Sequence, residues 1–296
     1  MFTTVILWPW LTGLVILALG LITARRELSA GPAMDRIAAA GGAFAGSSLA
    51  LFAAEHFTSA RFIMQGVPAY MPMRLFWAYF VGFALLAAGL SLVLKRYDGA
   101  ASLCTAVMML LFVLMIHAPL VHANPKQRIP WIVALRECAF ASGFLAYAGS
   151  KLRGCAWMVP LGRIVFALIM LFFAIENFLH PLTAPGIPLE KVIPAWFPLR
   201  FVWAYLSGLV LLAGGFGLLL NRWARQSAAA IGAWAAILTL FLYLPVWVEI
   251  MLHNNRNVGA LVEGMNYVGD TLLFAGAALL LASAASLYTP PYRAYR

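Results

Sequence analysis

The chain has 296 residues, of which 64% are hydrophobic and only 10% are charged. Roughly a quarter of the residues of a soluble globular domain are charged, so this composition excludes an ordinary soluble protein. The formal net charge of +10 does not indicate nucleic-acid binding here, because the Lys and Arg residues lie in short loops between long apolar segments. That distribution is typical of an integral membrane protein.

Nine apolar segments follow one another along the chain, and each is long enough to cross a bilayer core, which takes about 20 helical residues. The first is long for the core of a signal peptide, and its charges, Arg25 and Arg26, follow it, so we expect a retained helix. We predict an all-α membrane protein whose transmembrane helices span residues 4–24, 37–57, 74–94, 100–122, 131–150, 161–180, 199–220, 228–250 and 262–286.

The cationic residues differ in number between the two sides that these helices define. The loops after the first, third, fifth and seventh helices, with the C-terminus, carry twelve Lys and Arg residues, and the other side carries seven. The positive-inside rule then places the N-terminus outside and the C-terminus in the cytoplasm. We expect a bacterial inner membrane as the location.

Two segments of the chain are copies of each other. Residues 68–82 read PAYMPMRLFWAYFVG and residues 194–208 read PAWFPLRFVWAYLSG, at an offset of 126 positions. The same offset matches Pro119 to Pro245. Similarity at a fixed offset indicates a duplicated structural unit, and an even number of helices per unit makes both copies face the same way. We predict an additional N-terminal helix in residues 1–30 and four-helix units in residues 31–153 and 154–290.

The repeated pattern resembles that of a known family. In each copy an acidic residue and a Phe end the first helix, a Pro-Ala-aromatic-x-Pro loop follows, and the second helix carries Trp-x-x-x-x-Gly. Over about residues 37–286 the chain is similar to a fused tandem pair of DoxX-like four-helix membrane proteins. The resemblance implies a role in membrane redox systems, such as a subunit of a thiosulfate:quinone oxidoreductase. Relatives linked to disulfide chemistry carry cysteine pairs, whereas Cys104, Cys138 and Cys155 form no CxxC motif.

The ionisable residues gather on the predicted outer side, which holds all five histidines and seven of the ten acidic residues. Glu55 and Glu176 end helices, where the helix dipole disfavours a carboxylate, and Arg74 and Arg200 begin helices, where it disfavours a cation. We therefore predict Glu55–Arg74 and Glu176–Arg200 ion pairs. Such pairs act either as structural clasps between helices or as polar gates beside a pocket.

Two histidines accompany these charges. His180 lies four residues after Glu176 and is expected on the same helix face, whereas the first copy has His56 where the second has Asn177. The local spacing predicts no metal site, which leaves solvated histidines or proton-handling histidines at a quinone pocket. If one copy alone retains chemistry, we expect it where the copies differ. The candidate polar site comprises Glu55, His56, Arg74, Glu176, His180 and Arg200.

Four aromatic residues recur at one depth in the two copies. Trp77 and Tyr79, and likewise Trp203 and Tyr205, lie about one helical turn inside the outer boundary. Aromatic residues there are interfacial belt or packing residues, or form the wall of a quinone pocket. The two repeated prolines are expected to kink their helices and open space nearby.

These observations support three hypotheses. The first is a membrane subunit of a redox system that interacts with quinone near the periplasmic side or anchors a periplasmic oxidoreductase. The second is a non-enzymatic scaffold or accessory subunit of a larger membrane complex. A transporter is disfavoured, because the repeats are parallel and the membrane midplane has almost no ionisable residues. The expected partners are the bilayer and other membrane or periplasmic redox subunits, and quinone is the one cofactor suggested; catalysis is left open.

Overall fold

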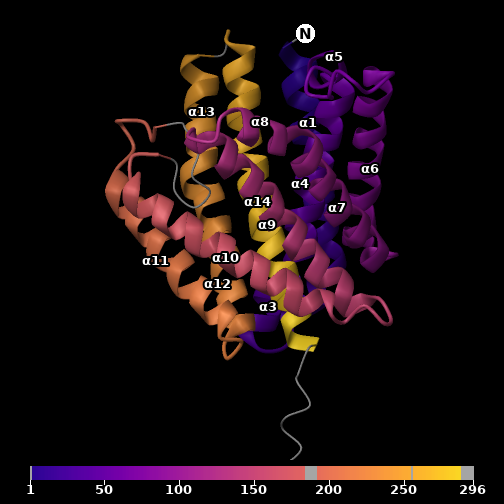
Figure 1. The fold of residues 1–296 in the computed structure, drawn as a ribbon, viewed down its shortest axis with the longest axis vertical. Coiled ribbons are helices and arrows are strands. Elements are labelled where there is room, and N and C mark those ends of the chain that lie inside the picture. Colours follow the sequence, from indigo (N-terminus) through magenta and orange to yellow (C-terminus); the bar gives the residue numbers. More distant parts are fainter. Residues whose placement is uncertain (1, 184–191, 255, 288–296) are drawn as a thin grey trace, which may run out of the picture.

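The structure is a computed structural model that describes residues 2–183, 192–254 and 256–287. Among these residues nine helices are long and apolar enough to cross a membrane, which confirms the predicted all-α membrane protein (Figure 1). The spans are Thr4–Thr23, Ala33–Thr58, Arg74–Leu94, Asp98–Ala123, Arg128–Lys151, Met158–Leu179, Arg200–Leu219, Ala224–His253 and Val258–Ala285. Three spans begin four residues earlier than predicted, and in two of them the added turn carries charged residues that hydropathy discounts, such as Asp35 and Arg225.

Several spans are made of more than one helical segment. The segments, in chain order, are α1 (Phe2–Thr23), α2 (Arg25–Ser29), α3 (Ala33–Ala39), α4 (Gly41–Thr58), α5 (Ala60–Ile63), α6 (Arg74–Leu94), α7 (Asp98–Phe112), the π-helical turn η1 (Val113–His117), α8 (Ala118–Ala123), α9 (Arg128–Lys151), α10 (Met158–Leu179), α11 (Arg200–Leu219), α12 (Ala224–Leu238), the π-helical turn η2 (Thr239–Tyr243), α13 (Leu244–His253) and α14 (Val258–Leu287). Among the described residues the extended backbone is limited to one isolated bridge, between Thr183 and Val192.

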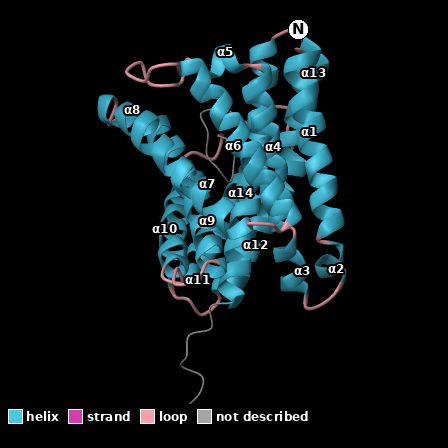
Figure 2. Cartoon of the chain, turned by 90° about the vertical axis from the view of Figure 1, so that its right-hand side faces the viewer, coloured by secondary structure: helices cyan, strands magenta, loops and turns pink. Residues whose placement is uncertain are grey.

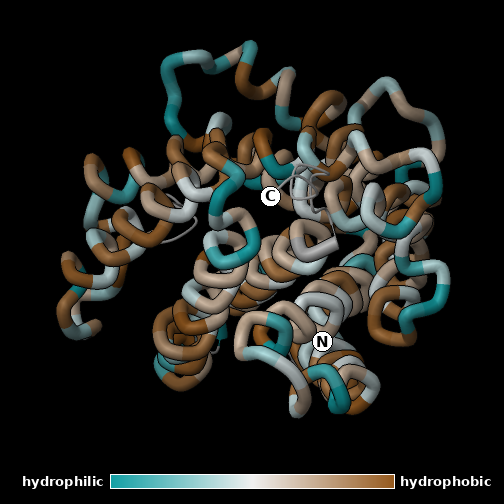
Figure 3. Tube along the Cα trace, turned by 90° about the horizontal axis from the view of Figure 1, so that it is seen from below, coloured by the Kyte–Doolittle hydropathy of each residue, from teal (hydrophilic) through white to brown (hydrophobic). Residues whose placement is uncertain are grey.

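The outer surface of the bundle is apolar. Large side chains such as Phe83 and Leu168 are 65% and 55% exposed on the middle of their helices. Figure 3 shows hydrophobic residues around the helices and hydrophilic residues mainly in the connecting segments. A surface of this kind is stable only in contact with lipid, so the chain is an integral membrane protein.

The structural features of the two predicted copies recur at the sequence offset of 126. Met73 and Leu199 both adopt left-handed backbone conformations, with φ of 53° and 54°, directly before α6 and α11. The turns η1 and η2 also begin 126 residues apart. Tyr79 stacks on Phe57 with ring centroids 6.4 Å apart, as Tyr205 stacks on Phe178 at 6.3 Å. This agreement supports the predicted duplication; the unit boundaries stay a prediction.

A proline explains each π-helical turn. Pro119 and Pro245 lie one residue into α8 and α13, where the missing N–H and the bulk of the ring disturb the preceding helical turn. The chain responds by widening that turn: the Ala118 and Leu244 amides each bond to the carbonyl five residues back. Figure 2 shows the result in the first copy, where α8 leans away from the rest of the bundle.

The two copies exchange packing partners. In each copy the first helix packs on the second and the third on the fourth, as α4 does on α6 and α7 on α9. In addition α4 packs on α14, and α10 packs on α9, so the first helix of each copy lies against the last helix of the other (Figure 1). Phe274 marks the shared core between the copies, with ring centroids 5.7 Å from Phe166 and 6.4 Å from Phe140.

Candidate functional site

The first copy encloses an apolar cavity of about 330 Å³ beside the N-terminal end of α6. Its walls come from the end of α4, the loop between α5 and α6, the first turns of α6, the end of α7, and η1. The widened η1 turn contributes three successive residues, so the space predicted near the proline is present here. The lining side chains used below are His56, Met71, Trp77, Val81, Met108 and His117.

Only one of the four predicted wall residues lines this cavity. Trp77 does so, and its indole N–H donates to the Pro72 carbonyl at 3.1 Å, which fixes the ring. Tyr79 lies on a different face of α6 and stacks on Phe57, because residues two apart on a helix do not share a face. Trp203 and Tyr205 belong to the second copy and pack on other rings.

His56 brings a polar group to the apolar wall. Its Nδ1 lies 2.8 Å from the Phe52 carbonyl oxygen, which only accepts hydrogen bonds, so Nδ1 carries the proton. Neutral His56 therefore presents Nε2 as an acceptor, and the protonated ring would present it as a donor. The half-buried His56 can thus exchange a hydrogen bond or a proton with a ligand in the cavity.

A larger side chain occupies part of the matching region of the second copy. At the offset of 126, Trp234 stands where the first copy has Met108 and Ser207 where it has Val81. The Trp234 ring stacks on Trp203 with centroids 6.0 Å apart, and its N–H donates to the Ser207 hydroxyl at 2.9 Å. The two copies have therefore diverged at this place: the second copy keeps only a smaller cavity of about 160 Å³, whose wall includes Pro194 and Tyr243.

The two copies also differ at the position of His56. In the second copy Asn177 donates its amide N–H to the Phe173 carbonyl at 2.8 Å, the counterpart of the bond from His56 to Phe52. Asparagine preserves this helix contact, but it cannot accept and release protons as an imidazole can. The sequence comparison of the copies had pointed to this position.

A buried cluster of charges lies behind the cavity. Arg136 on α9 places Nη1 2.7 Å from an oxygen of Asp270 on α14, and Nη2 3.8 Å from Glu137. All three side chains are only 13% exposed. Asp270 lies twelve residues after Val258 and fifteen before Ala285, near the middle of its span. These charges lie well inside their spans and are buried between helices instead of facing lipid.

The cluster extends towards both the cavity and the first carboxylate of the predicted site. Glu55 is 5% exposed and accepts a hydrogen bond from Asn266 at 3.3 Å, one turn before Asp270 on α14. On the other side η1 packs on α9 and brings His117, a cavity wall residue, within electrostatic range of Arg136. Arg136 and three carboxyl groups, those of Glu137, Asp270 and Glu55, are thus buried in the part of the bundle next to the cavity wall.

The predicted ion pairs of Glu55 with Arg74 and of Glu176 with Arg200 were wrong. Arg74 instead donates to the Gln65 carbonyl at 2.8 Å, and Arg200 reaches the Ile193 carbonyl at 3.4 Å. Both arginines thereby fasten the loop that precedes their own helix. Local helix dipoles suggested these pairs, but the actual partners of the two glutamates come from the other copy.

Glu176 is paired across the copies. Arg128, at the start of α9, places Nε 2.5 Å from Glu176 and donates to the Thr183 hydroxyl at 3.3 Å. His180 does not share the carboxylate's face as expected, because α10 ends at Leu179 and His180 is an exposed residue beyond it. The six residues of the predicted polar site therefore do not form one cluster, and His56 alone among them lines the cavity.

Sequence analysis missed several residues of the buried polar contacts, although some of them carried a recognisable signal. Arg136, Glu137 and Asp270 stand inside apolar spans, and intramembrane charge is a functional hypothesis by default. Asn266 and Arg128 carried no such signal, because their roles depend on which helices pack together. Of the seven acids predicted on the outer side, Glu190 lies outside the described residues.

Within residues 2–183, 192–254 and 256–287 no group of three or more His, Cys, Asp or Glu side chains is placed to hold a metal ion. Cys104, Cys138 and Cys155 are free thiols in this structure. Comparison with models of protein families, with curated proteins and with solved structures finds no significant match to this chain.

Proposed function

We propose that the chain is a membrane subunit of a redox system and binds the ring of a quinone in the cavity of the first copy. The observation that carries the proposal is the cavity itself, an apolar and partly aromatic space with imidazoles from α4 and η1 in its wall. Binding sites of this type combine an apolar lining with a few polar groups that fix orientation. A bound quinone would supply electron and proton transfer within the membrane.

Different residues of the cavity wall would contact different parts of the quinone. Trp77 supplies a fixed ring surface, and Met71 and Met108 are flexible side chains that adapt to the ring's shape. His56 offers Nε2 to a ring oxygen, while His117 connects the wall to the buried charges. The similarity to DoxX-like proteins supports the same proposal and adds a membrane or periplasmic redox subunit as the partner.

A photoreactive short-chain quinone tests the proposal directly. Purified protein would be labelled with and without excess decylubiquinone, digested, and mapped by mass spectrometry. We expect competable labels on the first turns of α6 and on η1. Labelling that is spread evenly over the apolar surface, or that decylubiquinone does not reduce, would contradict the proposal and favour a scaffold role, for which co-purification with a stoichiometric partner is the positive test.

One observation favours a second function, proton-coupled transport. Arg136 and Asp270 lie near the middle of the membrane, the depth at which transporters hold their coupling groups. Reconstitution into liposomes that contain a pH-sensitive dye separates the two functions. Proton flux without any added quinone, abolished by Asp270→Asn, would favour transport over the redox role.

A further inference from the structure

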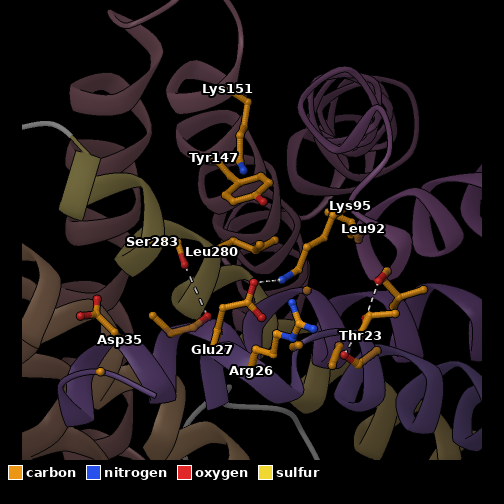
Figure 4. Close-up of a pocket in the computed structure, with 18 of the residues that line it drawn as sticks. Thr23, Arg26, Glu27, Asp35, Leu92, Lys95, Tyr147, Lys151, Leu280 and Ser283 are labelled. Atoms are coloured by element: carbon orange, nitrogen blue, oxygen red, sulfur yellow. Dashed lines mark hydrogen bonds and ion pairs between the residues drawn. The ribbon is translucent and has the colours of Figure 1, made fainter. Parts of the chain in front are cut away.

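A second and larger cavity, of about 670 Å³, lies at the opposite end of the bundle (Figure 4). It opens where α1 passes through α2 into α3, beside the C-terminal ends of α6, α9 and α14. The first cavity lies at the start of α6 and this one at its end, so the two are separated by the length of that helix.

Basic side chains outnumber acidic ones in the wall of this cavity. Four cations face two carboxylates among the lining residues, which leaves an excess of two positive charges. The cations are Arg26, Lys95, Lys151 and Arg225, and the carboxylates are Glu27 and Asp35. Such an excess in a partly enclosed space attracts anions.

Two ion pairs within the wall involve Lys95 and Arg225 but not Arg26. Lys95 pairs with Glu27 at 2.5 Å, and Arg225 pairs with Asp35. Arg26 has no ion-pair partner among the described residues, yet Figure 4 shows it extending towards the same part of the cavity as Lys95. Two cations therefore converge there on a single carboxylate.

Lys151 adds a third cation from the opposite wall. It lies 3.4 Å from Asp98 and 5.1 Å from the centre of the Tyr147 ring, whose hydroxyl donates to Asp98 at 2.7 Å. Tyr147 and Lys151 both line the cavity (Figure 4). The phenol and the ammonium are thereby held at the wall, with part of the ammonium's hydrogen-bonding capacity left for a ligand.

The cavity wall is charged just beyond the ends of the membrane spans and apolar within them. Arg26 and Lys95 lie just outside the spans that contain Gly20 and Val93, and all four residues line the cavity. Gly20 of α1 and Ala43 of α4 lie in close contact and form part of the apolar wall. This arrangement matches a molecule with an anionic head at the membrane surface and an apolar part in the membrane, and basic pockets between transmembrane helices are known to hold anionic headgroups.

We propose that this cavity binds a phosphate group, presented by an anionic phospholipid whose apolar part enters the space beside α1. Arg26 and Lys95 contact the phosphate from one wall and Lys151 from the other. The residues involved differ from those of the quinone cavity, so the proposal stands independently of the proposed function.

Native mass spectrometry of delipidated protein tests this site. The protein in detergent would be titrated with phosphatidylglycerol, with phosphatidylcholine and with inorganic phosphate, and each titration repeated on Arg26→Gln and Lys151→Gln. Arg25→Gln is the matched control, because Arg25 is an exposed neighbour that does not line the cavity. Both cavity variants should weaken phosphatidylglycerol binding about fivefold, since one basic residue contributes that much near a membrane surface.

Two results would support the site and identify its source of phosphate. If the protein prefers phosphatidylglycerol, and this preference is reduced by Arg26→Gln but unchanged by Arg25→Gln, the phosphate comes from a lipid headgroup. Binding of inorganic phosphate with the same dependence on Arg26, and displacement of the lipid by it, assigns a free anion. Equal retention of both lipids, or equal weakening by Arg25→Gln and Arg26→Gln, would overturn the proposal.

Discussion

Placing in the first cavity the ring that occupies part of the matching region of the second copy should weaken quinone binding without unfolding the protein. The variant Met108→Trp with Val81→Ser introduces the ring found at Trp234 and the hydroxyl that Ser207 gives it. The new indole N–H would then have a partner at 2.9 Å, as in the second copy. The design therefore avoids leaving a buried donor unsatisfied.

The expected loss follows from the contacts that the ligand would give up. In a bilayer a quinone leaves lipid, not water, to enter the cavity, so the hydrophobic effect contributes little. What remains is one ring contact with Trp77, worth about 1 kcal/mol, and one hydrogen bond with His56, worth about 1 kcal/mol in membranes. A total of about 2 kcal/mol corresponds to a roughly 30-fold change in Kd.

The assay is equilibrium binding of decylubiquinone to protein in nanodiscs, with thermal unfolding recorded in parallel. Val81→Ser alone is the control, because it introduces the hydroxyl without filling the cavity. His56→Asn, which copies Asn177, should weaken binding about fivefold through the lost hydrogen bond, while Asn177→His should leave it unchanged. A filled variant that still binds with wild-type affinity and melting temperature would refute the assignment of the cavity.

Three further changes test the charges. Asp270→Asn should destabilise the protein by about 3–5 kcal/mol, because the buried Arg136 then loses its close ion pair and keeps only Glu137, at 3.8 Å. Adding Arg136→Gln to this variant should restore much of the loss in thermal unfolding. Arg128→Ala should lower the melting temperature more than Arg200→Ala, since Arg128 carries the ion pair of a buried glutamate; equal shifts would contradict this. The hydrogen bond from Lys95 holds the pKa of Glu27 below its ordinary value of 4.5, so the pair's contribution to stability is complete above that pH and is lost as pH falls through the lowered value. Because the pair is exposed, Glu27→Gln should remove no more than about 0.5 kcal/mol at pH 7, and progressively less as the pH falls below 4.5.

Hydrophobicity alone predicted the nine spans, because each had to provide about 20 apolar residues regardless of its neighbours. The repeat likewise predicted the paired features around Pro119 and Pro245, since these depend on local backbone chemistry. The carboxylate partners were not predictable in this way. They depend on α4 lying against α14 and α10 against α9, and the sequence held no local sign of that exchange.

The midplane charges were missed for a related reason. Arg136 and Asp270 are 134 positions apart, and each alone reads as a polar interruption near one end of an apolar segment. Only the packing of α9 on α14 brings them within 2.7 Å and makes their burial tolerable. Comparison of the copies would have found one further feature, the exchange of Met108 for Trp234.

The exchange of partners between the copies makes a last prediction, that neither four-helix unit is stable alone. Buried polar contacts cross between the units, among them Arg136 with Asp270, Arg128 with Glu176, and Asn266 with Glu55. A fragment that ends at residue 153 keeps Arg136 and Glu55 but loses Asp270 and Asn266, and a buried cation that has lost its close partner is costly within the membrane.

Expressed alone, residues 1–153 should therefore be degraded or aggregate, whereas co-expression with residues 154–296 should restore a complex that co-purifies. Substituting Asp270→Asn in the second fragment should weaken that complex, which separates the role of the charge from general apolar packing. A first fragment that is monodisperse and thermally stable on its own would show that the contacts between the copies are not needed for the fold. In that case the buried charges would have to be explained by function alone.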